Sequence, residues 1–222
     1  MERLRILIAD DHEVVRQGIV GMLTSRRDWE VCGQASDGRE AIKMIEKLKP
    51  DLVILDITMP GLNGIDTARQ VRKMMPDIKI LIYSMHYAER LVQEVFQAGA
   101  DGYVLKTDAG KHLVQAIETI MSGQRFVSSK VSEVIFEGFL RGSSGTGGAG
   151  EPAQGAEERL SARERETVQL LAEGKSNKEV AAILGISPKT AETHRATIMR
   201  KLGLSTFSDL VRYAVRNGII EP

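Results

Sequence analysis

Five polar residues in the first half of the chain follow short apolar runs, and their chemistry suits the transfer of a phosphoryl group. They are Asp10, Asp11, Asp56, Ser84 and Lys106. Carboxylates gathered in one place repel one another, so a divalent cation would stabilise them, and Mg²⁺ accepts both carboxylate and phosphate oxygens. A hydroxyl and an ammonium group could then hold the phosphoryl oxygens, because positioning and charge neutralisation dominate this reaction.

These residues meet only if the runs before them are neighbouring strands of one sheet. Short runs rich in Val and Ile predict strands at residues 4–9, 29–32, 52–55, 78–83 and 102–105. Helical spacing of apolar residues predicts helices at residues 13–26, 39–48, 64–75, 88–98 and 111–122. Five strand–helix units in series predict a parallel sheet covered on both faces, whose ligands bind at the carboxyl ends of the strands.

Each of the five polar residues also has a purely structural interpretation. An aspartate at a strand end can cap the next helix, and Lys106 alone would be a solvated surface lysine. The combination favours a site, because a suitable polar residue follows four of the five predicted strands. The turn at residues 59–61 and Gly64 then lead from Asp56 into the next helix.

The second half of the chain predicts four helices and no strand, at residues 162–173, 177–184, 188–202 and 205–217. Ser161 and Glu164 form a capping-box pattern at the start of the first. Residues 177–202 have the pattern of a helix-turn-helix, in which Gly185 makes the turn and Ser187 caps the next helix. A plain helical hairpin with a glycine turn is the alternative at this stage.

A glycine-rich segment separates these halves. Residues 142–158 contain almost no large apolar side chain, so they predict a flexible linker, with a long surface loop inside one domain as the alternative. A sixth amphipathic segment at residues 129–140 predicts a helix that leads into the linker. The predicted organisation is therefore residues 1–123, a connecting helix and linker at 124–158, and a helical domain at 159–222.

Composition excludes several classes of protein. The 222 residues are 42% hydrophobic and 27% charged, which is ordinary for a globular protein and excludes disorder over the whole length. Cys32 is the single cysteine, so a disulfide framework or cysteine zinc site is excluded and a reducing, cytoplasmic setting is expected. No apolar run approaches the ~18 residues that a membrane span needs, and no signal peptide is expected.

Net charge is uneven along the chain although it totals zero. Residues 1–141 carry 19 basic and 20 acidic side chains, residues 142–158 add three acids, and residues 159–222 carry 11 basic and 7 acidic ones. A zero total argues mildly against nucleic acid as a partner. The net +4 of the helical half instead favours contact with a phosphate backbone.

Residues 3–123 resemble the receiver domain of a two-component response regulator, which has a flavodoxin-like (βα)5 fold. The resemblance rests on Asp10-Asp11, on residues 56–64, on Ser84 and on Tyr103-Val104-Leu105-Lys106. It implies that Asp56 accepts a phosphoryl group from a sensor histidine kinase, and that Asp10, Asp11, Asp56 and the main-chain carbonyl of Thr58 hold Mg²⁺. It also implies that Lys106 pairs with the phosphoryl oxygens, that Ser84 is the switch hydroxyl and that Tyr103 is the switch aromatic.

Two residues depart from the receiver pattern. Thr107 stands where family members commonly have a proline after the lysine, and Ser84 stands where Thr is frequent. Thr58 and His86 occupy positions that influence the lifetime of the aspartyl phosphate in the family, although His86 also suits a loop without such a role. His12 is expected to be structural, in the turn after the acidic pair.

Residues 159–220 resemble a LuxR-type DNA-binding domain, so the whole chain resembles a NarL/FixJ-type response regulator. The resemblance rests on residues 160–164, 176–181, 187–195 and 201–204. It implies a recognition helix in the major groove and binding as a dimer to paired half-sites. Base-facing positions would be Glu192, Thr193 and Ala196, and candidates for phosphate contacts are Lys178, Lys189, Thr190, Arg195 and Lys201.

Two roles are open for Glu192, where many relatives have lysine. The carboxylate could accept a hydrogen bond from cytosine N4, or it could orient Arg195. Lys201 could equally be a cation that complements the helix dipole.

The main hypothesis is a cytoplasmic, DNA-binding transcription regulator, not an enzyme acting on other molecules. Its expected partners are a sensor histidine kinase, double-stranded DNA, RNA polymerase and, on phosphorylation, a second copy of itself. Three alternatives compete with it. They are constitutive DNA binding with a vestigial receiver, a magnesium phosphatase that forms an aspartyl phosphate, and a flavin-binding fold, which the acids at the strand ends disfavour.

Overall fold

The computed structural model describes residues 3–133, 135–136 and 160–220. The chain forms two compact units, Met1–Ser144 and Gly145–Pro222, which are described separately. The predicted linker and the last residues of the predicted connecting helix lie outside the described residues. Residues 129–133 and 135–136 of that helix are helical.

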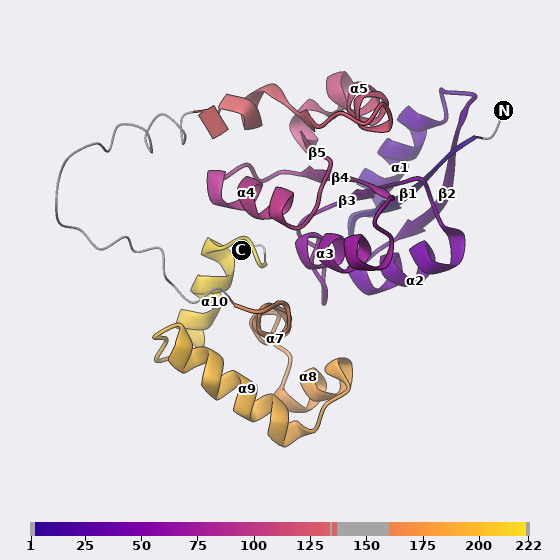
Figure 1. Ribbon diagram of the computed structural model, residues 1–222. Coiled ribbons are helices and arrows are strands. Elements are labelled where there is room, and N and C mark those ends of the chain that lie inside the picture. Colours follow the sequence, from indigo (N-terminus) through magenta and orange to yellow (C-terminus); the bar gives the residue numbers. More distant parts are fainter. Residues whose placement is uncertain (1–2, 134, 137–159, 221–222) are drawn as a thin grey trace. The chain divides into compact units, whose positions relative to one another are not determined.

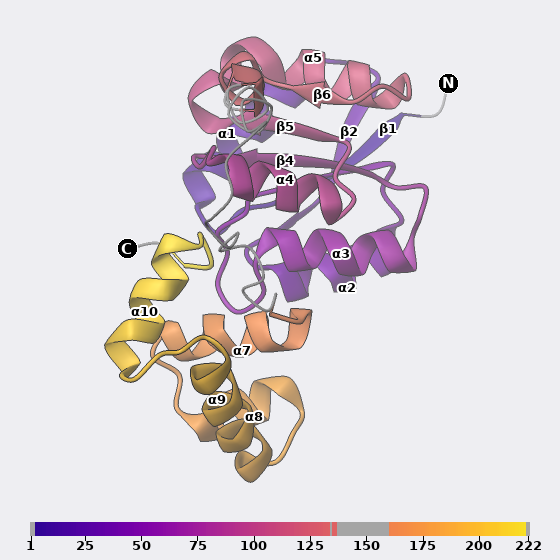
Figure 2. The same ribbon diagram turned by 60° about the vertical axis from the view of Figure 1, so that its left-hand side comes forward.

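The first unit is built on a six-stranded parallel sheet with the strand order β2-β1-β3-β4-β5-β6. Figure 1 labels β1 to β5, and Figure 2 also labels β6. Its strands are β1 Leu4–Ala9, β2 Trp29–Ala35, β3 Leu52–Leu55, β4 Lys79–Ser84, β5 Gly102–Leu105 and β6 Phe126–Val127. The five predicted strands are confirmed. The sixth was not predicted, because two residues are too short to show a strand pattern.

Helices cover both faces of this sheet (Figure 2). They are α1 Glu13–Leu23, α2 Gly38–Leu48, α3 Gly64–Met74, α4 Glu89–Gln97 and α5 Ala109–Met121. Along β1, Ile6 and Ile8 pack in the cluster that includes α1 and α5, whereas Leu7 and Ala9 pack in the cluster that includes α2, α3 and α4. Strand side chains alternate between two buried faces, so the doubly covered α/β prediction is confirmed.

The strand order reverses between β1 and β3, and the acidic residues follow these two strands. The Asp10 N–H donates to the Ala35 carbonyl at 3.2 Å, and the Asp56 N–H donates to the Ala9 carbonyl at 2.8 Å, which holds both residues at one sheet edge. A Cβ at Gly64 would lie only 1.9 Å from the Asp56 main-chain oxygen. Glycine is therefore required where the loop after Asp56 turns back into α3.

The second unit consists, in its described part, of the helices α7 Ala162–Ala172, α8 Asn177–Leu184, α9 Pro188–Lys201 and α10 Phe207–Arg216. They pack around one apolar core that includes Val168, Ala181, Ile198 and Leu210. The Ser161–Glu164 capping box is present, which confirms the predicted start of α7. Gly185 ends α8 with φ of +65°, and Pro188 begins α9, so the predicted helix-turn-helix is confirmed.

Among the helices that the structure describes, none has the length and apolar character that a membrane span needs.

Candidate functional site

The predicted acidic site forms at the carboxyl edge of β1 and β3, around one lysine. Asp10 and Asp56 are buried, and the Lys106 Nζ atom lies 2.8 Å from Oδ2 of Asp10 and 2.7 Å from Oδ2 of Asp56. The other oxygen of Asp56 accepts the N–H of Ile57 at 2.7 Å. A single ammonium group therefore bridges two buried carboxylates that come from different strands.

Asp11 and His12 complete the acidic group at its exposed side. The Nδ1 atom of His12 lies 2.7 Å from Asp11 Oδ1, and the His12 N–H donates to Asp10 Oδ1 at 2.9 Å. One potential ligand atom from each of Asp10, Asp11, His12 and Asp56 lies within 4.8 Å of the others. The structure thus brings the three predicted carboxylates together and places His12 beside them, where the sequence indicated only a structural turn.

Burial disfavours the ionised form of Asp56. It raises the pKa of Asp56 to about 6, against the lowering effect of Lys106, and the nearby Asp10 adds to the rise. Burial alone would lower the pKa of Lys106, but Asp56 and Asp10 outweigh it and raise that pKa. Three acids with one lysine leave an excess of negative charge on hard oxygen atoms, and these donors fit a divalent cation such as Mg²⁺.

Ser84 and Tyr103 lie together beside the acidic group. Both are fully buried, at the end of β4 and within β5. The His86 N–H donates to the Ser84 hydroxyl at 3.3 Å, and the Tyr103 hydroxyl donates to the His86 main-chain carbonyl. Burial raises the pKa of Tyr103, and a hydrogen bond with Ser84 opposes this only in part. The two predicted switch residues therefore both contact the chain at residue 86.

Thr107 does not prevent Lys106 from reaching the carboxylates. Residues Lys106–Asp108 form one turn of 3-10 helix, and every peptide bond in the described residues is trans. The Lys106–Thr107 bond is therefore trans as well, and Lys106 still bridges Asp10 and Asp56.

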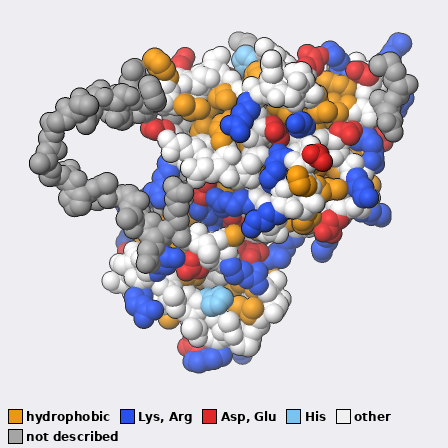
Figure 3. All heavy atoms as spheres, viewed as in Figure 1, with side chains coloured by type: hydrophobic (Ala, Val, Ile, Leu, Met, Phe, Trp, Pro, Cys, Tyr) orange, Lys and Arg blue, Asp and Glu red, His pale blue; other side chains and the backbone are white. Residues whose placement is uncertain are grey.

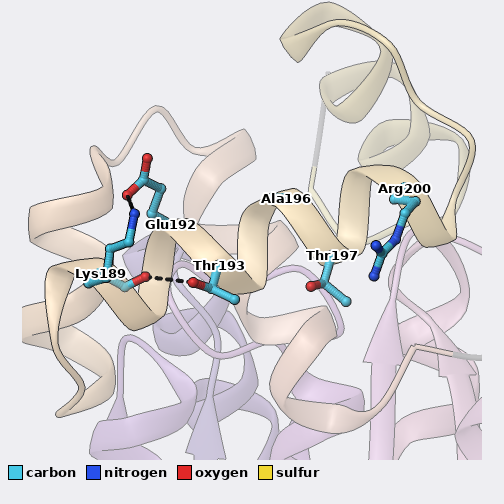
Figure 4. A pocket seen from close by; sticks show the side chains of 6 residues that line it. All are labelled: Lys189, Glu192, Thr193, Ala196, Thr197 and Arg200. Atoms are coloured by element: carbon cyan, nitrogen blue, oxygen red, sulfur yellow. Dashed lines mark hydrogen bonds and ion pairs between the residues drawn. The ribbon is translucent and has the colours of Figure 1, made fainter.

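The second site is a groove along the predicted recognition helix, α9. Its volume is about 430 Å³ and it is lined by Lys189, Glu192, Thr193, Ala196, Thr197 and Arg200. Figure 4 shows these side chains along one length of α9, with Lys189 and Glu192 near its first turn and Arg200 near its last. The Ser187 hydroxyl caps the helix by accepting the Thr190 N–H at 3.0 Å. On the face seen in Figure 3, the helical unit carries Lys and Arg side chains interspersed with acidic ones.

Six of the predicted DNA-contact residues are exposed, namely Lys178, Lys189, Thr190, Glu192, Thr193 and Ala196. The other two are partly buried by contacts within the unit. The Arg195 guanidinium lies over the Phe207 ring at 5.5 Å, and Lys201 Nζ lies 3.1 Å from Glu164 Oε2. Glu192 pairs with Lys189 at 3.0 Å, whereas Arg195, which it could have oriented, lies over Phe207. The contact of Glu192 with a cytosine stays a prediction.

Sequence reasoning did not select Thr197 and Arg200 as candidates for DNA contact, although both line the groove. Helical spacing contained the signal, because Thr197 follows Thr193 by four residues and Arg200 follows Ala196 by four. His12 was also missed as a member of the acidic group. Its ring lies there because the chain turns directly from β1 into α1.

Comparison with known proteins gives matches to both units. The family model "Response regulator receiver domain" matches residues 6–118, and "Bacterial regulatory proteins, luxR family" matches residues 158–214. The oxygen regulatory protein NreC of Staphylococcus aureus is 37% identical over 220 residues, which are 98% of this chain and 100% of NreC.

Solved structures of response regulators are also similar. The Salmonella typhimurium RcsB response regulator is 28% identical, with a TM-score of 0.60 over 97% of this chain and 100% of the RcsB chain. An RcsB–DNA complex is 26% identical, with a TM-score of 0.59 over 97% of this chain and 99% of that one. The chain therefore belongs to the NarL/FixJ-type two-component response regulators, in which a receiver domain precedes a LuxR-type DNA-binding domain.

Proposed function

We propose that Asp56 accepts a phosphoryl group from the phosphohistidine of a sensor kinase. A carboxylate oxygen of Asp56 attacks phosphorus, a P–O bond forms, the P–N bond breaks, and its electron pair returns to the imidazole. The observation that carries this proposal is the position of Asp56, which is buried at the sheet edge with Lys106 Nζ 2.7 Å away. Lys106 can neutralise an incoming phosphoryl oxygen without a change in its protonation state.

The same site is proposed to use Mg²⁺, held by Asp10, Asp11, Asp56 and the main-chain carbonyl of Thr58. The bound ion would neutralise charge on the phosphoryl oxygens. The proximity of the three carboxylates and the raised pKa of Asp56, caused mainly by burial, support this donor set. His12 pairs with Asp11 at the exposed edge of the acidic group and would help to orient the Asp11 carboxylate.

Phosphorylation is proposed to act through Ser84 and Tyr103. A phosphoryl group on Asp56 would accept the Ser84 O–H and draw that side chain toward it, which would break the hydrogen bond that Ser84 now accepts from the His86 N–H. Tyr103 is held to the same residue. A change in one contact therefore alters the chain that leads into α4. This gives the receiver two states whose populations phosphorylation would shift.

The regulator is proposed to work in the cytoplasm as a homodimer that controls transcription, with RNA polymerase as a further partner. RcsB, a similar protein, has been solved as dimers bound to DNA, which supports a dimer here. DNA would contact the candidates on α9 and Lys178 at the start of α8. The division into residues 1–123, 124–158 and 159–222 remains a prediction. We also propose that Asp56 loses its phosphoryl group slowly and that the protein does not turn over other substrates.

Phosphotransfer to the full chain tests the proposal. With Mg²⁺ and a small acyl phosphate as donor, intact-protein mass spectrometry should show the gain of one phosphoryl group, removable by hydroxylamine. Asp56→Asn or excess EDTA should abolish the gain, while Asp77→Asn, at an exposed acid in the loop before β4, should not. Stable labelling of Asp56→Asn would refute Asp56 as the acceptor. Steady hydrolysis of an external phosphoester would favour the phosphatase alternative instead.

A further inference from the structure

An exposed ion pair stands at the first turn of the groove on α9. Lys189 Nζ lies 3.0 Å from Glu192 Oε2, and the two side chains are 83% and 58% exposed. Figure 4 shows the pair beside Thr193, at one end of the row of six groove residues. The pair presents an ammonium donor and a carboxylate acceptor side by side toward any ligand of this groove.

A carboxylate at a DNA-facing position restricts what it can contact. It repels phosphates, and ionised it accepts hydrogen bonds but donates none. In the major groove, cytosine N4 is a donor, and the guanine paired with it presents the acceptors O6 and N7. An A·T pair instead flanks its single donor with acceptors on both sides, which would repel the carboxylate.

The other two base-facing candidates, Thr193 and Ala196, offer no charged group that could replace Glu192 or Lys189. The Thr193 hydroxyl donates to the Lys189 main-chain carbonyl at 2.9 Å, and Ala196 offers only a methyl group. In the described part of the chain, Arg195 lies over Phe207 rather than beside Glu192. Lys189 is therefore the cation that accompanies Glu192.

We propose that Lys189 and Glu192 together select a C·G base pair in each half-site. Glu192 accepts from cytosine N4, and Lys189 donates to the guanine of the same pair rather than to a phosphate. This inference rests on the proposed binding of DNA through α9. Both side chains can reach one base pair because Lys189 and Glu192 are three residues apart and therefore neighbours on one face of the helix.

Selection of binding sites from random double-stranded DNA tests the inference. The phosphorylated full chain should enrich half-sites with an invariant C·G pair at one position. Glu192→Gln should lose that preference or change it to A·T, because glutamine suits adenine N6 and N7, and it should keep the other positions. The control Glu30→Gln removes the same charge from an exposed site on β2 and should select the wild-type sequence.

Affinity measurements with matched DNA make the test quantitative. Replacing the selected C·G pair by T·A should weaken binding of the wild-type chain roughly tenfold or more, and binding of Glu192→Gln much less. Identical base preference in wild type and Glu192→Gln would overturn this inference and leave DNA binding intact. Failure of the phosphorylated wild type to enrich any sequence would instead overturn the proposed function, and this inference with it.

Discussion

At the scale of single residues, the acidic group contains more carboxylates than Lys106 alone can neutralise. Asp10 and Asp56 are buried and share one lysine, and burial raises the pKa of Asp56 to about 6. A raised carboxyl pKa means that the ionised form is disfavoured in the native state. An ionised Asp56 therefore reduces the stability of the native state near neutral pH.

The pH dependence of stability should report Asp56. Between the ordinary aspartate value of about 4 and about 6, native Asp56 keeps a proton that the unfolded chain has released. The free energy of unfolding should therefore fall across this window as pH rises, and stay level above it. Asp56→Asn removes the titrating group, so it should be about 1–3 kcal/mol more stable than wild type at pH ~7.5 without divalent cations, and about equal near pH ~4.

Urea unfolding of the receiver, followed by Trp29 fluorescence in EDTA, measures this difference. Trp29 is the only tryptophan and is buried in the core that includes α1 and α5. Equal stability of the two proteins at both pH values would show that the Asp56 carboxylate carries no such penalty.

Addition of Mg²⁺ should reverse the penalty, because a cation that binds only the native state stabilises it. In the same unfolding assay, wild type should gain stability as Mg²⁺ is raised. Asp11→Asn should lose most of the gain, since Asp11 is an exposed member of the acidic group. Asp77→Asn, outside that group, should retain it, and equal gains in all three proteins would argue against this ligand set.

At the scale of elements, turn and cap residues set where each functional side chain lies. Ser187 caps α9 and Gly185 ends α8 in a left-handed conformation, so two local contacts position the recognition helix. Space is not the constraint at Gly185, because an added Cβ would meet nothing within 4 Å. The constraint is its φ of +65°, which other residues adopt only at a cost.

Substitution of Gly185 should therefore depend on backbone preference alone. Gly185→Ala should destabilise the helical unit by about 1–2 kcal/mol, while Gly185→Asn should cost less because asparagine tolerates this conformation. Hydrogen exchange of the α8 and α9 amides in the full chain measures both effects. An alanine variant as protected as wild type would contradict the role given to the turn.

The elements were largely predictable because their signals are local. Val- and Ile-rich runs, caps and the glycine turn identify the strands, the helices of the second unit and the predicted site of Asp10, Asp56 and Lys106. What was missed depends on tertiary structure. Strand β6 has two residues and exists only through pairing with β5, and His12 joins the acidic group through a tight turn. The contact of Arg195 with Phe207 joins α9 to a helix whose packing the sequence does not state.

At the scale of the whole molecule, the net charge of zero conceals an uneven distribution of charge along the chain. The first unit holds an acidic site that suits a cation and a phosphoryl group, and residues 159–222 carry a net +4 that suits DNA. The family relationship shows a receiver domain and a DNA-binding domain in one regulator. The central claim is that the phosphoryl state of Asp56 controls how well the helical domain binds DNA.

Gel-shift titration of one selected DNA site tests that claim most directly. Wild type would be measured with and without phosphodonor and Mg²⁺, and Asp56→Asn with both. The account predicts tighter binding by phosphorylated wild type than by unphosphorylated wild type, with Asp56→Asn unaffected by the donor. Equal affinity under all three conditions would contradict it, and would favour constitutive DNA binding with a receiver that no longer signals.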